Sequence, residues 1–157
     1  MRKSGLPPVL DENTEILIMG TLPGDKTLAA GQYYADRRNY FWKLVGAALN
    51  QNLVGSPYQG KISCLKENRI GSWDAYHSVI RPGSMDGDIS GQEFNDFAVL
   101  KELAPKLRLV CFNGADAAAP EKSLTWQGYQ TRPLPSSSGA YRGDQEERLS
   151  RWKAALT

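Results

Sequence analysis

The chain has 157 residues and a mass of 17.4 kDa, which predicts a single domain spanning residues 1–157. Hydrophobic residues make up 41% and charged residues 23%, a composition that is ordinary for a soluble globular protein and excludes disordered and collagen-like chains. No apolar run approaches the roughly 20 residues of a membrane helix, and the first residues carry no apolar signal segment. We therefore expect an unprocessed, cytoplasmic protein that has no membrane partner.

The balance of charged residues and the small number of cysteines and histidines exclude further classes of function. The chain has 19 basic and 17 acidic residues, so a DNA-binding surface would have to be a local patch. Two cysteines, Cys64 and Cys111, and one histidine, His77, cannot supply the four ligands of a zinc or iron–sulfur site. We therefore expect no cofactor and no metal.

The first half of the chain predicts a strand, a turn, a helix and a second strand. The apolar run at residues 15–20 ends at a glycine, and its length suits a buried parallel strand followed by a turn over residues 21–25. From Asn39 onward, apolar residues recur at intervals of three and four, which places one face of a helix against a core. A second strand is predicted around residues 70–73, and residues 81–92 have loop composition.

The second half alternates in the same way. Its periodicity predicts a helix, a strand, a helix and a strand at residues 97–104, 107–112, 115–119 and 129–134. Asp144, with Glu147 three residues later, resembles a capping box. The helix that follows has its buried stripe at Leu149, Trp152 and Leu156.

Strands that alternate with helices indicate an α/β fold, with a three-layer α/β/α arrangement around a mainly parallel sheet of about four strands. In such sheets, ligands bind beyond the carboxyl ends of the strands. We therefore expect the functional site in the segments 20–25, 73–77, 112–114 and 134–142.

The loop that enters the first helix combines residue types that suit nucleic acid. It contains two tyrosines, two arginines and an asparagine: Tyr33, Tyr34, Arg37, Arg38 and Asn39. Aromatic faces stack on bases and arginines bind phosphates, although solvated charge is the alternative for the arginines. The turn after the first strand could point backbone N–H groups at an anion or a carbonyl, or could be a plain connection. It consists of Gly20, Thr21, Leu22, Pro23 and Gly24.

Several short motifs follow one another in a fixed order: a G-x-x-P-G turn, an aromatic residue about ten positions later, an N-x-F-W helix start and an L-P-S-S-S loop at residues 134–138. Together they resemble the uracil-DNA glycosylase superfamily. Residues 71–74, 81–86 and 112–114 are most similar to its hypoxanthine-DNA glycosylase branch. The resemblance covers most of the chain. It implies a four-stranded parallel sheet with flanking helices and hydrolysis of a base–sugar bond in DNA.

The resemblance assigns a role to two residues of the helix-entry loop. Asn39 matches the asparagine that the branch uses for catalysis, and its amide oxygen could accept from the attacking water. Thr21 and Leu22 stand where many members carry the residue that holds that water. Tyr34 matches the aromatic residue that stacks on the flipped base. The alternative role for Asn39 is a helix N-cap.

Asp74 matches the residue that reads the edge of the base in related glycosylases. An ionised carboxylate accepts from the ring N–H of hypoxanthine or uracil, and adenine and cytosine lack that proton. Asp74 could instead cap a helix or pair with an arginine. Asn113 could line the pocket or belong to a simple turn, and His77 is interpreted as a packed or surface histidine.

The late loop departs from the family at Leu134, where several branches carry a histidine or asparagine that donates to the departing base. In this chain, backbone N–H groups and the hydroxyls of Ser136, Ser137 and Ser138 would instead donate to the departing base. The alternative is that the segment is a plain surface loop. Tyr141 stands near the side chain that relatives insert into the gap in DNA. Phosphate contacts are expected from four residues: Arg37, Arg38, Lys43 and Arg142.

The resemblance implies a monofunctional, monomeric DNA N-glycosylase that acts on DNA containing deaminated bases, hypoxanthine first, with uracil and xanthine as further candidates. A mismatch-specific uracil or thymine glycosylase is one alternative, although that relative normally carries an asparagine where this chain has Leu22. A catalytically silent DNA-binding module of the same fold is the other. A zinc deaminase is excluded, because the H-x-E and C-x-x-C elements are absent.

Overall fold

The computed structural model describes residues 2–80 and 90–157. Its central sheet has the strand order β3-β2-β6-β7, and every neighbouring pair of strands is parallel. The four strands are β2 (Ile16–Gly20), β3 (Ile70–Asp74), β6 (Leu109–Asn113) and β7 (Gln130–Leu134). All four strands predicted from the sequence are confirmed, with ends that differ by at most two residues.

The continuous apolar runs of β2 and β6 reflect a sheet that is buried on both faces. Because successive side chains on a strand point to opposite faces, Ile16 and Ile18 enter one core, and Leu17 and Met19 enter the other. The residues of β6 divide between the same two cores. The chain therefore has a layer of helices on each face, which confirms the predicted three-layer α/β/α architecture.

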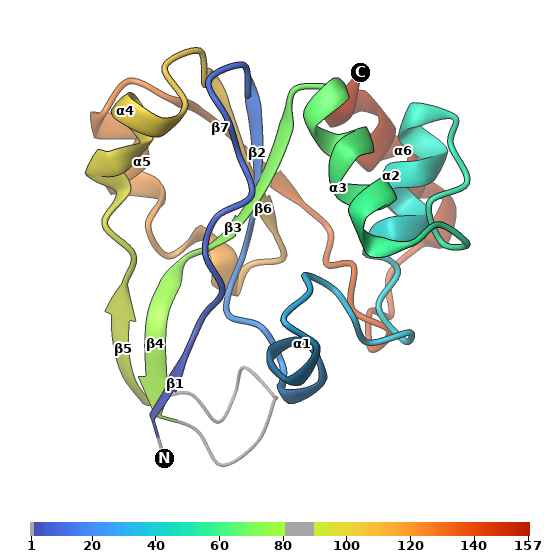
Figure 1. Ribbon diagram of the computed structural model, residues 1–157, viewed down its shortest axis with the longest axis horizontal. Helices are drawn as coiled ribbons and strands as arrows, with labels where there is room; N and C mark the ends of the chain where they lie inside the picture. The colour runs from blue at the N-terminus through green and yellow to red at the C-terminus, as the bar shows by residue number, and fades with distance from the viewer. Residues whose placement is uncertain (1, 81–89) are drawn as a thin grey trace.

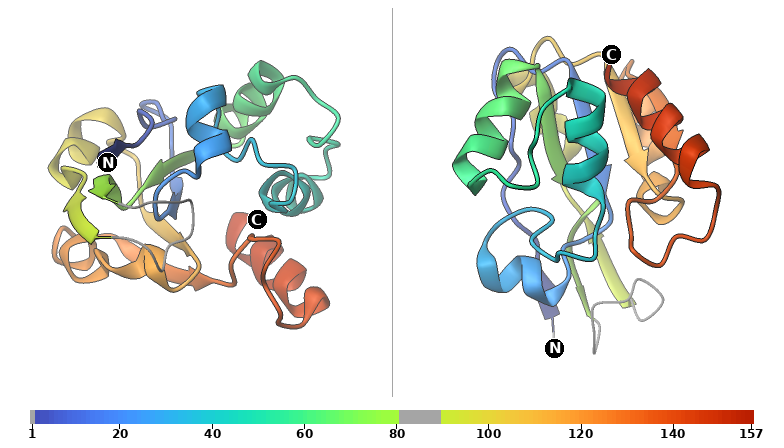
Figure 2. Two further views of the ribbon diagram at one scale, coloured as in Figure 1. Left: turned by 90° about the horizontal axis from the view of Figure 1, so that it is seen from below. Right: turned by 90° about the vertical axis from the view of Figure 1, so that its right-hand side faces the viewer.

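Figures 1 and 2 show these two layers around the sheet. One layer consists of α2 (Phe41–Leu49), α3 (Tyr58–Glu67) and α6 (Gln145–Leu156). The other consists of two short helices and two 3₁₀ turns: η2 (Phe97–Val99), α4 (Leu100–Leu103), η3 (Asp116–Ala118) and α5 (Glu121–Trp126). The predicted helical segments at 97–104 and 115–119 are therefore present as shorter pieces.

The predicted cap of the last helix by Asp144 is confirmed. The carboxylate of Asp144 accepts a hydrogen bond from the Glu147 N–H at 3.0 Å, which satisfies one of the unpaired donors of the first turn. Trp152 and Leu156 are buried, and Leu149 packs against the same core. None of the helices in the described part of the chain has the length and apolar character needed to span a bilayer.

Short or polar elements were not predicted. The helices α1 (Asp25–Ala30), α3 and α5 were missed; in α3 only Leu65 is fully buried, so the sequence has no clear apolar stripe there. A small antiparallel sheet has the order β1-β4-β5 and was also missed. Its strands are β1 (Arg2–Ser4), β4 (Tyr76–Ile80) and β5 (Ser90–Phe94).

The prediction of a loop over residues 81–92 is wrong at its end, because residues 90–92 belong to β5. β5 is held by backbone pairing with β4, and such pairing does not require an apolar sequence. Residues 81–89, which include the motif at 81–86, lie outside the described residues.

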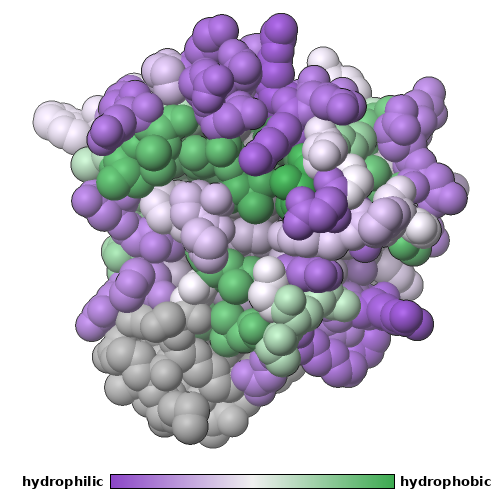
Figure 3. Space-filling model, in the orientation of Figure 1, coloured by the Kyte–Doolittle hydropathy of each residue, from purple (hydrophilic) through white to green (hydrophobic). Residues whose placement is uncertain are grey.

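The face of the molecule presented in Figure 3 is largely hydrophilic, with a band of hydrophobic residues across its upper half. Among the described residues, the exposed large hydrophobic side chains include Leu103 of α4 and Trp126 of α5. Isolated residues of this kind are normal on a protein surface. The features that suit a ligand lie instead at the end of the sheet marked by α1.

Candidate active site

A cavity of about 1200 Å³ opens at the carboxyl ends of the central strands, and we call it the strand-end cavity. α1, which follows β2, marks this end of the sheet in Figure 1. All four segments expected to carry the site contribute to its walls. The sequence-predicted residues that line it are Gly20, Thr21, Leu22, Pro23, Gly24, Tyr34, Arg37, Arg38, Asn39, Asp74, Asn113, Ser136, Ser137 and Ser138. The remaining predicted residues, Lys43, Tyr141 and Arg142, are not part of this lining.

Asn39 belongs to a hydrogen-bond network that joins the loop before α2 to the serine loop, residues 135–141. Its Oδ1 accepts from the Phe41 N–H at 2.9 Å and from the Ser137 hydroxyl at 2.7 Å. A backbone N–H can only donate, so this contact fixes which end of the Asn39 amide is the oxygen. The N-cap position of α2 is Tyr40, so the helix-capping alternative is wrong; Asn39 lies one residue earlier and accepts from the first N–H of the helix.

These contacts change the chemistry that Asn39 can offer. Both in-plane lone pairs of its amide oxygen are used by protein donors, so that oxygen is not available to hold a water as the sequence suggested. For the Nδ2 group, by contrast, no hydrogen bond to another described residue is recorded, and Asn39 lines the cavity. The amide group that Asn39 can present to a ligand is therefore a donor.

Ser137 is the buried centre of the network, with 1% of its surface exposed. Its Oγ accepts from Asn113 Nδ2 at 2.8 Å and donates its single proton to Asn39. The other two serine hydroxyls accept from backbone N–H groups within the loop, Ser136 from Ser138 and Ser138 from Ala140. The protons of the Ser136 and Ser138 hydroxyls therefore remain available to a ligand, whereas that of Ser137 does not.

Tyr34 adopts a left-handed backbone conformation, with φ of 55°, which is uncommon for a residue other than glycine. Its ring stacks on Phe41, with centroids 3.8 Å apart and planes 7° apart. Its hydroxyl accepts from Asn113 Nδ2 at 3.2 Å. Strained residues of this kind often occur at functional sites, and here the strain places an aromatic ring in the cavity wall.

Asp74 is the last residue of β3, where it pairs in register with Gly20 at the end of β2. It is 4% exposed and lines the cavity. A Cβ atom added to Gly20 would lie 2.7 Å from Asp74 Oδ1 and 3.0 Å from the Tyr34 hydroxyl oxygen. Glycine at position 20 therefore lets the carboxylate and the tyrosine hydroxyl approach the same point.

The surroundings of Asp74 include two residues that the sequence did not assign to the site. Asn95 Nδ2 donates to the backbone oxygen of Asp74 at 2.7 Å, which ties the end of β3 to the residue after β5. Burial, and then the charge of Asp74, raise the pKa of the Tyr33 hydroxyl above its ordinary value. This hydroxyl donates to the backbone oxygen of Pro7 at 2.8 Å, so Tyr33 acts as a neutral structural group.

Arg148, on α6, holds the serine loop and was not predicted from the sequence. It is 2% exposed, and its Nη1 donates to the backbone oxygens of Ser136 at 3.1 Å and Ser138 at 3.3 Å. Its guanidinium carbon lies 4.7 Å from the centre of the Tyr40 ring and 4.8 Å from that of Tyr141. The sequence did indicate that position 148 is buried, since it lies one turn before the buried Trp152 on the apolar stripe of α6.

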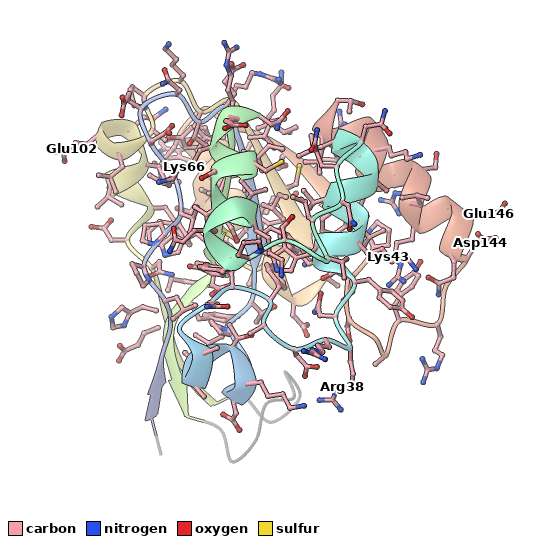
Figure 4. The ribbon with its side chains drawn as sticks, turned by 45° about the vertical axis from the view of Figure 1, so that its right-hand side comes forward. Arg38, Lys43, Lys66, Glu102, Asp144 and Glu146 are labelled. Atoms are coloured by element: carbon pink, nitrogen blue, oxygen red, sulfur yellow. The ribbon has the colours of Figure 1, made fainter. Side chains whose placement is uncertain are left out.

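The basic residues around the cavity are not equivalent. Arg38 forms a two-point ion pair with Asp36, with contacts of 2.8 and 3.1 Å, and this arginine holds the pKa of Asp36 at about 2. Figure 4 shows Arg38 extending away from the body of the protein below α2, and Lys43 on α2 itself. Arg37, Lys43 and Arg142 are exposed.

The other polar groups in the described part of the chain do not form a second candidate catalytic or metal site. His77 is exposed, with Nδ1 4.0 Å from Glu93 Oε2, which agrees with the interpretation as a surface histidine. Among residues 2–80 and 90–157, no group of three or more His, Cys, Asp or Glu residues is placed to hold a metal ion.

A parallel four-stranded sheet flanked by helices is the fold that the motifs implied, and the serine loop lines part of the cavity at its carboxyl end. Residues 7–156 match the family model of the Uracil DNA glycosylase superfamily, and the chain belongs to this superfamily.

Individual relatives are similar over the whole chain. A hypoxanthine DNA glycosylase of Methanosarcina acetivorans is 51% identical over 156 residues, and one of Methanosarcina barkeri is 45% identical over 156 residues; each alignment covers 99% of both chains. A solution NMR structure from Methanosarcina acetivorans, described as a candidate uracil DNA glycosylase, superposes with a TM-score of 0.91 at 51% identity. That alignment covers 99% of this chain and 97% of the other.

Proposed function

We propose that this protein is a monofunctional DNA N-glycosylase of base excision repair, which flips a deaminated base out of DNA and hydrolyses the bond between that base and its sugar. Hypoxanthine is its first substrate, with uracil and xanthine as further ones. The observation that carries the proposal is that one cavity is lined by Tyr34, Asp74 and Asn39, in a chain about half identical to a hypoxanthine DNA glycosylase.

Each of these three side chains suits one step of the reaction. The ring of Tyr34 stacks on the flipped base, and the carboxylate of Asp74 accepts the N1–H of hypoxanthine or the N3–H of uracil. Cleavage leaves negative charge on the departing base, and a donor aimed at that charge lowers the barrier. The Nδ2 group of Asn39 supplies such a donor, with the hydroxyls of Ser136 and Ser138 as further candidates.

The partner in this proposal is DNA that contains a deaminated base. Arg37, Lys43 and Arg142 are exposed and contact phosphates, and Tyr141 lies near the gap left by the flipped base. We also infer a single domain over residues 1–157 that works as a cytoplasmic monomer without cofactor or metal, as the composition suggests.

Single-turnover assays test the function directly. Duplex and single-stranded oligonucleotides carrying hypoxanthine, uracil, xanthine or mismatched thymine are incubated with excess enzyme, and abasic sites are cleaved with alkali. We expect release of hypoxanthine to be fastest. Absence of release from all substrates, together with retained DNA binding, would instead support the catalytically silent module.

The same assay addresses the mismatch-specific alternative. Leu22 is buried in the first turn, where that relative carries an asparagine, and this observation disfavours the alternative. Preferred release of uracil or thymine from mismatches with guanine would reverse the assignment.

A further inference from the structure

The side chain of Asn113, at the end of β6, has both ends of its amide engaged by other site residues. Its Oδ1 accepts from the Ser137 N–H at 2.8 Å, and its Nδ2 donates to Ser137 Oγ at 2.8 Å and to the Tyr34 hydroxyl at 3.2 Å. The contact with the Ser137 N–H fixes the orientation of the amide, because a backbone N–H can only donate. With both amide protons engaged, Asn113 is poorly suited to read a base edge itself.

The orientation of Asn113 determines the direction of the whole chain of hydrogen bonds. Because Asn113 donates to Ser137 Oγ, the hydroxyl proton of Ser137 is directed to Asn39 Oδ1, 2.7 Å away. If that proton pointed the other way, two oxygen lone pairs would face each other at this distance. The Phe41 N–H would still hold Asn39 Oδ1, but repulsion from Ser137 Oγ would displace the amide and shift its Nδ2 donor in the cavity.

We propose that Asn113 is a positioning residue that acts through Ser137 to hold the Asn39 amide with its Nδ2 donor facing the departing base. This inference rests on the proposed function, since it assumes that base release takes place in the strand-end cavity. Asn113 contributes to the rate by preorganising a donor rather than by touching the reacting atoms, and a preorganised donor is typically worth about 10²- to 10³-fold in rate.

The variant Asn113→Asp tests the direction of the hydrogen bonds with little change in size. An ionised carboxylate still accepts from the Ser137 N–H. It also accepts a hydrogen bond from the Ser137 hydroxyl, which then no longer donates to Asn39, so the direction of the hydrogen bonds is reversed. A protonated carboxyl group can donate to Ser137 Oγ and restore the original direction. We expect hypoxanthine release by Asn113→Asp to be roughly 10- to 100-fold slower than by the wild type near pH 8, and the ratio to rise as the pH falls toward about 4, the ordinary pKa of an aspartate.

Two comparisons separate this effect from simple damage to the fold. The wild type is measured at each pH, which accounts for the other titratable groups of the cavity, among them Tyr34, Asp74 and Asp116. The variant Asn113→Leu has no group that titrates, so its rate relative to the wild type should stay low and constant with pH.

The variant Ser137→Ala keeps both backbone contacts of Ser137, its N–H to Asn113 and its carbonyl oxygen from Tyr40, and removes its hydroxyl. We expect a reduced kcat with nearly unchanged binding of hypoxanthine DNA. When Asn113→Asp is combined with Ser137→Ala, it should cause no pH-dependent loss of rate beyond that of Ser137→Ala alone, since the two residues act through the same series of hydrogen bonds.

The outcomes distinguish this inference from the proposed function. If the wild type releases no base, the proposed function is wrong. If the wild type is active and the Asn113→Asp ratio does not change with pH, or if Ser137→Ala has wild-type kcat, Asn113 is not a positioning residue. If Asn113→Asp does not fold, the kcat of Ser137→Ala alone tests whether Asn113 acts through Ser137.

Discussion

Tyr34 lies flat on Phe41, with ring centroids 3.8 Å apart and ring planes 7° apart. Phe41 is fully buried at the start of α2, so this stack anchors the Tyr34 ring to the core on one of its two faces. Under the proposed function, a flipped base stacks on the opposite face of this anchored ring, and stacking of this kind is worth about 1 to 3 kcal/mol per base.

The first prediction concerns this ring. Tyr34→Ala should weaken binding of hypoxanthine DNA relative to undamaged DNA by about 5- to 150-fold, because it removes the stacking ring. Tyr34→Phe keeps the ring and loses the hydroxyl, including its contact with Asn113, so it should bind within a few-fold of the wild type. Fluorescence anisotropy with both duplexes measures the difference. Equal losses in the two variants would mean that the hydroxyl, not the ring, is the important group.

The second prediction separates the two roles considered for Asn39. Asn39→Ala should slow single-turnover base release by at least about 10²-fold while DNA binding survives, since the stacking ring and the basic residues remain. Asn39→Asp keeps an oxygen for Phe41 and Ser137 but replaces the Nδ2 donor with a second acceptor. We expect it to be as slow as the alanine variant. An aspartate variant close to wild-type rates would restore the water-holding role suggested by the sequence.

The sequence was sufficient for the central sheet because burial on both faces makes each core strand apolar throughout. It was not sufficient for α3, in which only Leu65 is fully buried, or for β5, which is stabilised by pairing with β4. These elements depend on neighbours that are distant in the sequence. Their formation leaves little trace in local hydrophobic periodicity.

The residues of the candidate site were likewise predicted only in part from the sequence. Motif resemblance indicated residues that do line one cavity, such as Asn39 and Asp74. It could not indicate the direction of the hydrogen bonds from Asn113 through Ser137, because direction depends on which partner each amide meets in three dimensions. It also missed Arg148, because its partners are backbone carbonyls of the serine loop, and these meet the side chain only in the folded structure.

The third prediction tests the role of Arg148 in holding the serine loop. Arg148→Met keeps an unbranched side chain but leaves the partly buried carbonyls of Ser136 and Ser138 without this donor. We expect a loss of about 1 to 3 kcal/mol in the free energy of unfolding and a lower rate of base release. Arg151→Met, on the exposed side of the same helix, is the control and should change stability by no more than about 0.5 kcal/mol. Thermal or urea unfolding gives both values, and similar losses would contradict the assignment.

The fourth prediction concerns DNA phosphates. Arg38 is already paired with Asp36, whereas no ion pair of Arg37 with another described residue is recorded. Arg37→Ala should therefore reduce the slope of log Kd against log salt by about one unit, and Arg38→Ala should change it less. Because the pKa of Asp36 is held at about 2, this pair persists at any pH well above that value and is lost as the pH falls through it. A larger change for Arg38→Ala than for Arg37→Ala would show that DNA displaces Asp36.

The last prediction tests how the cavity recognises its base. Under the proposed function, Asp74 accepts the ring N–H that hypoxanthine and uracil share. Asp74→Ala should then slow the release of both, by roughly 5- to 150-fold if loss of the contact costs about 1 to 3 kcal/mol in the transition state. Asp74→Asn offers an acceptor and a donor together, and uracil has O4 beside N3–H to receive that donor. Its preference should move toward uracil, although the six-position carbonyl of hypoxanthine competes for the same group. Single-turnover rates on both substrates measure the shift. Equal rates for the wild type and Asp74→Ala on both bases would make Asp74 a structural residue and assign recognition to the backbone groups of the cavity.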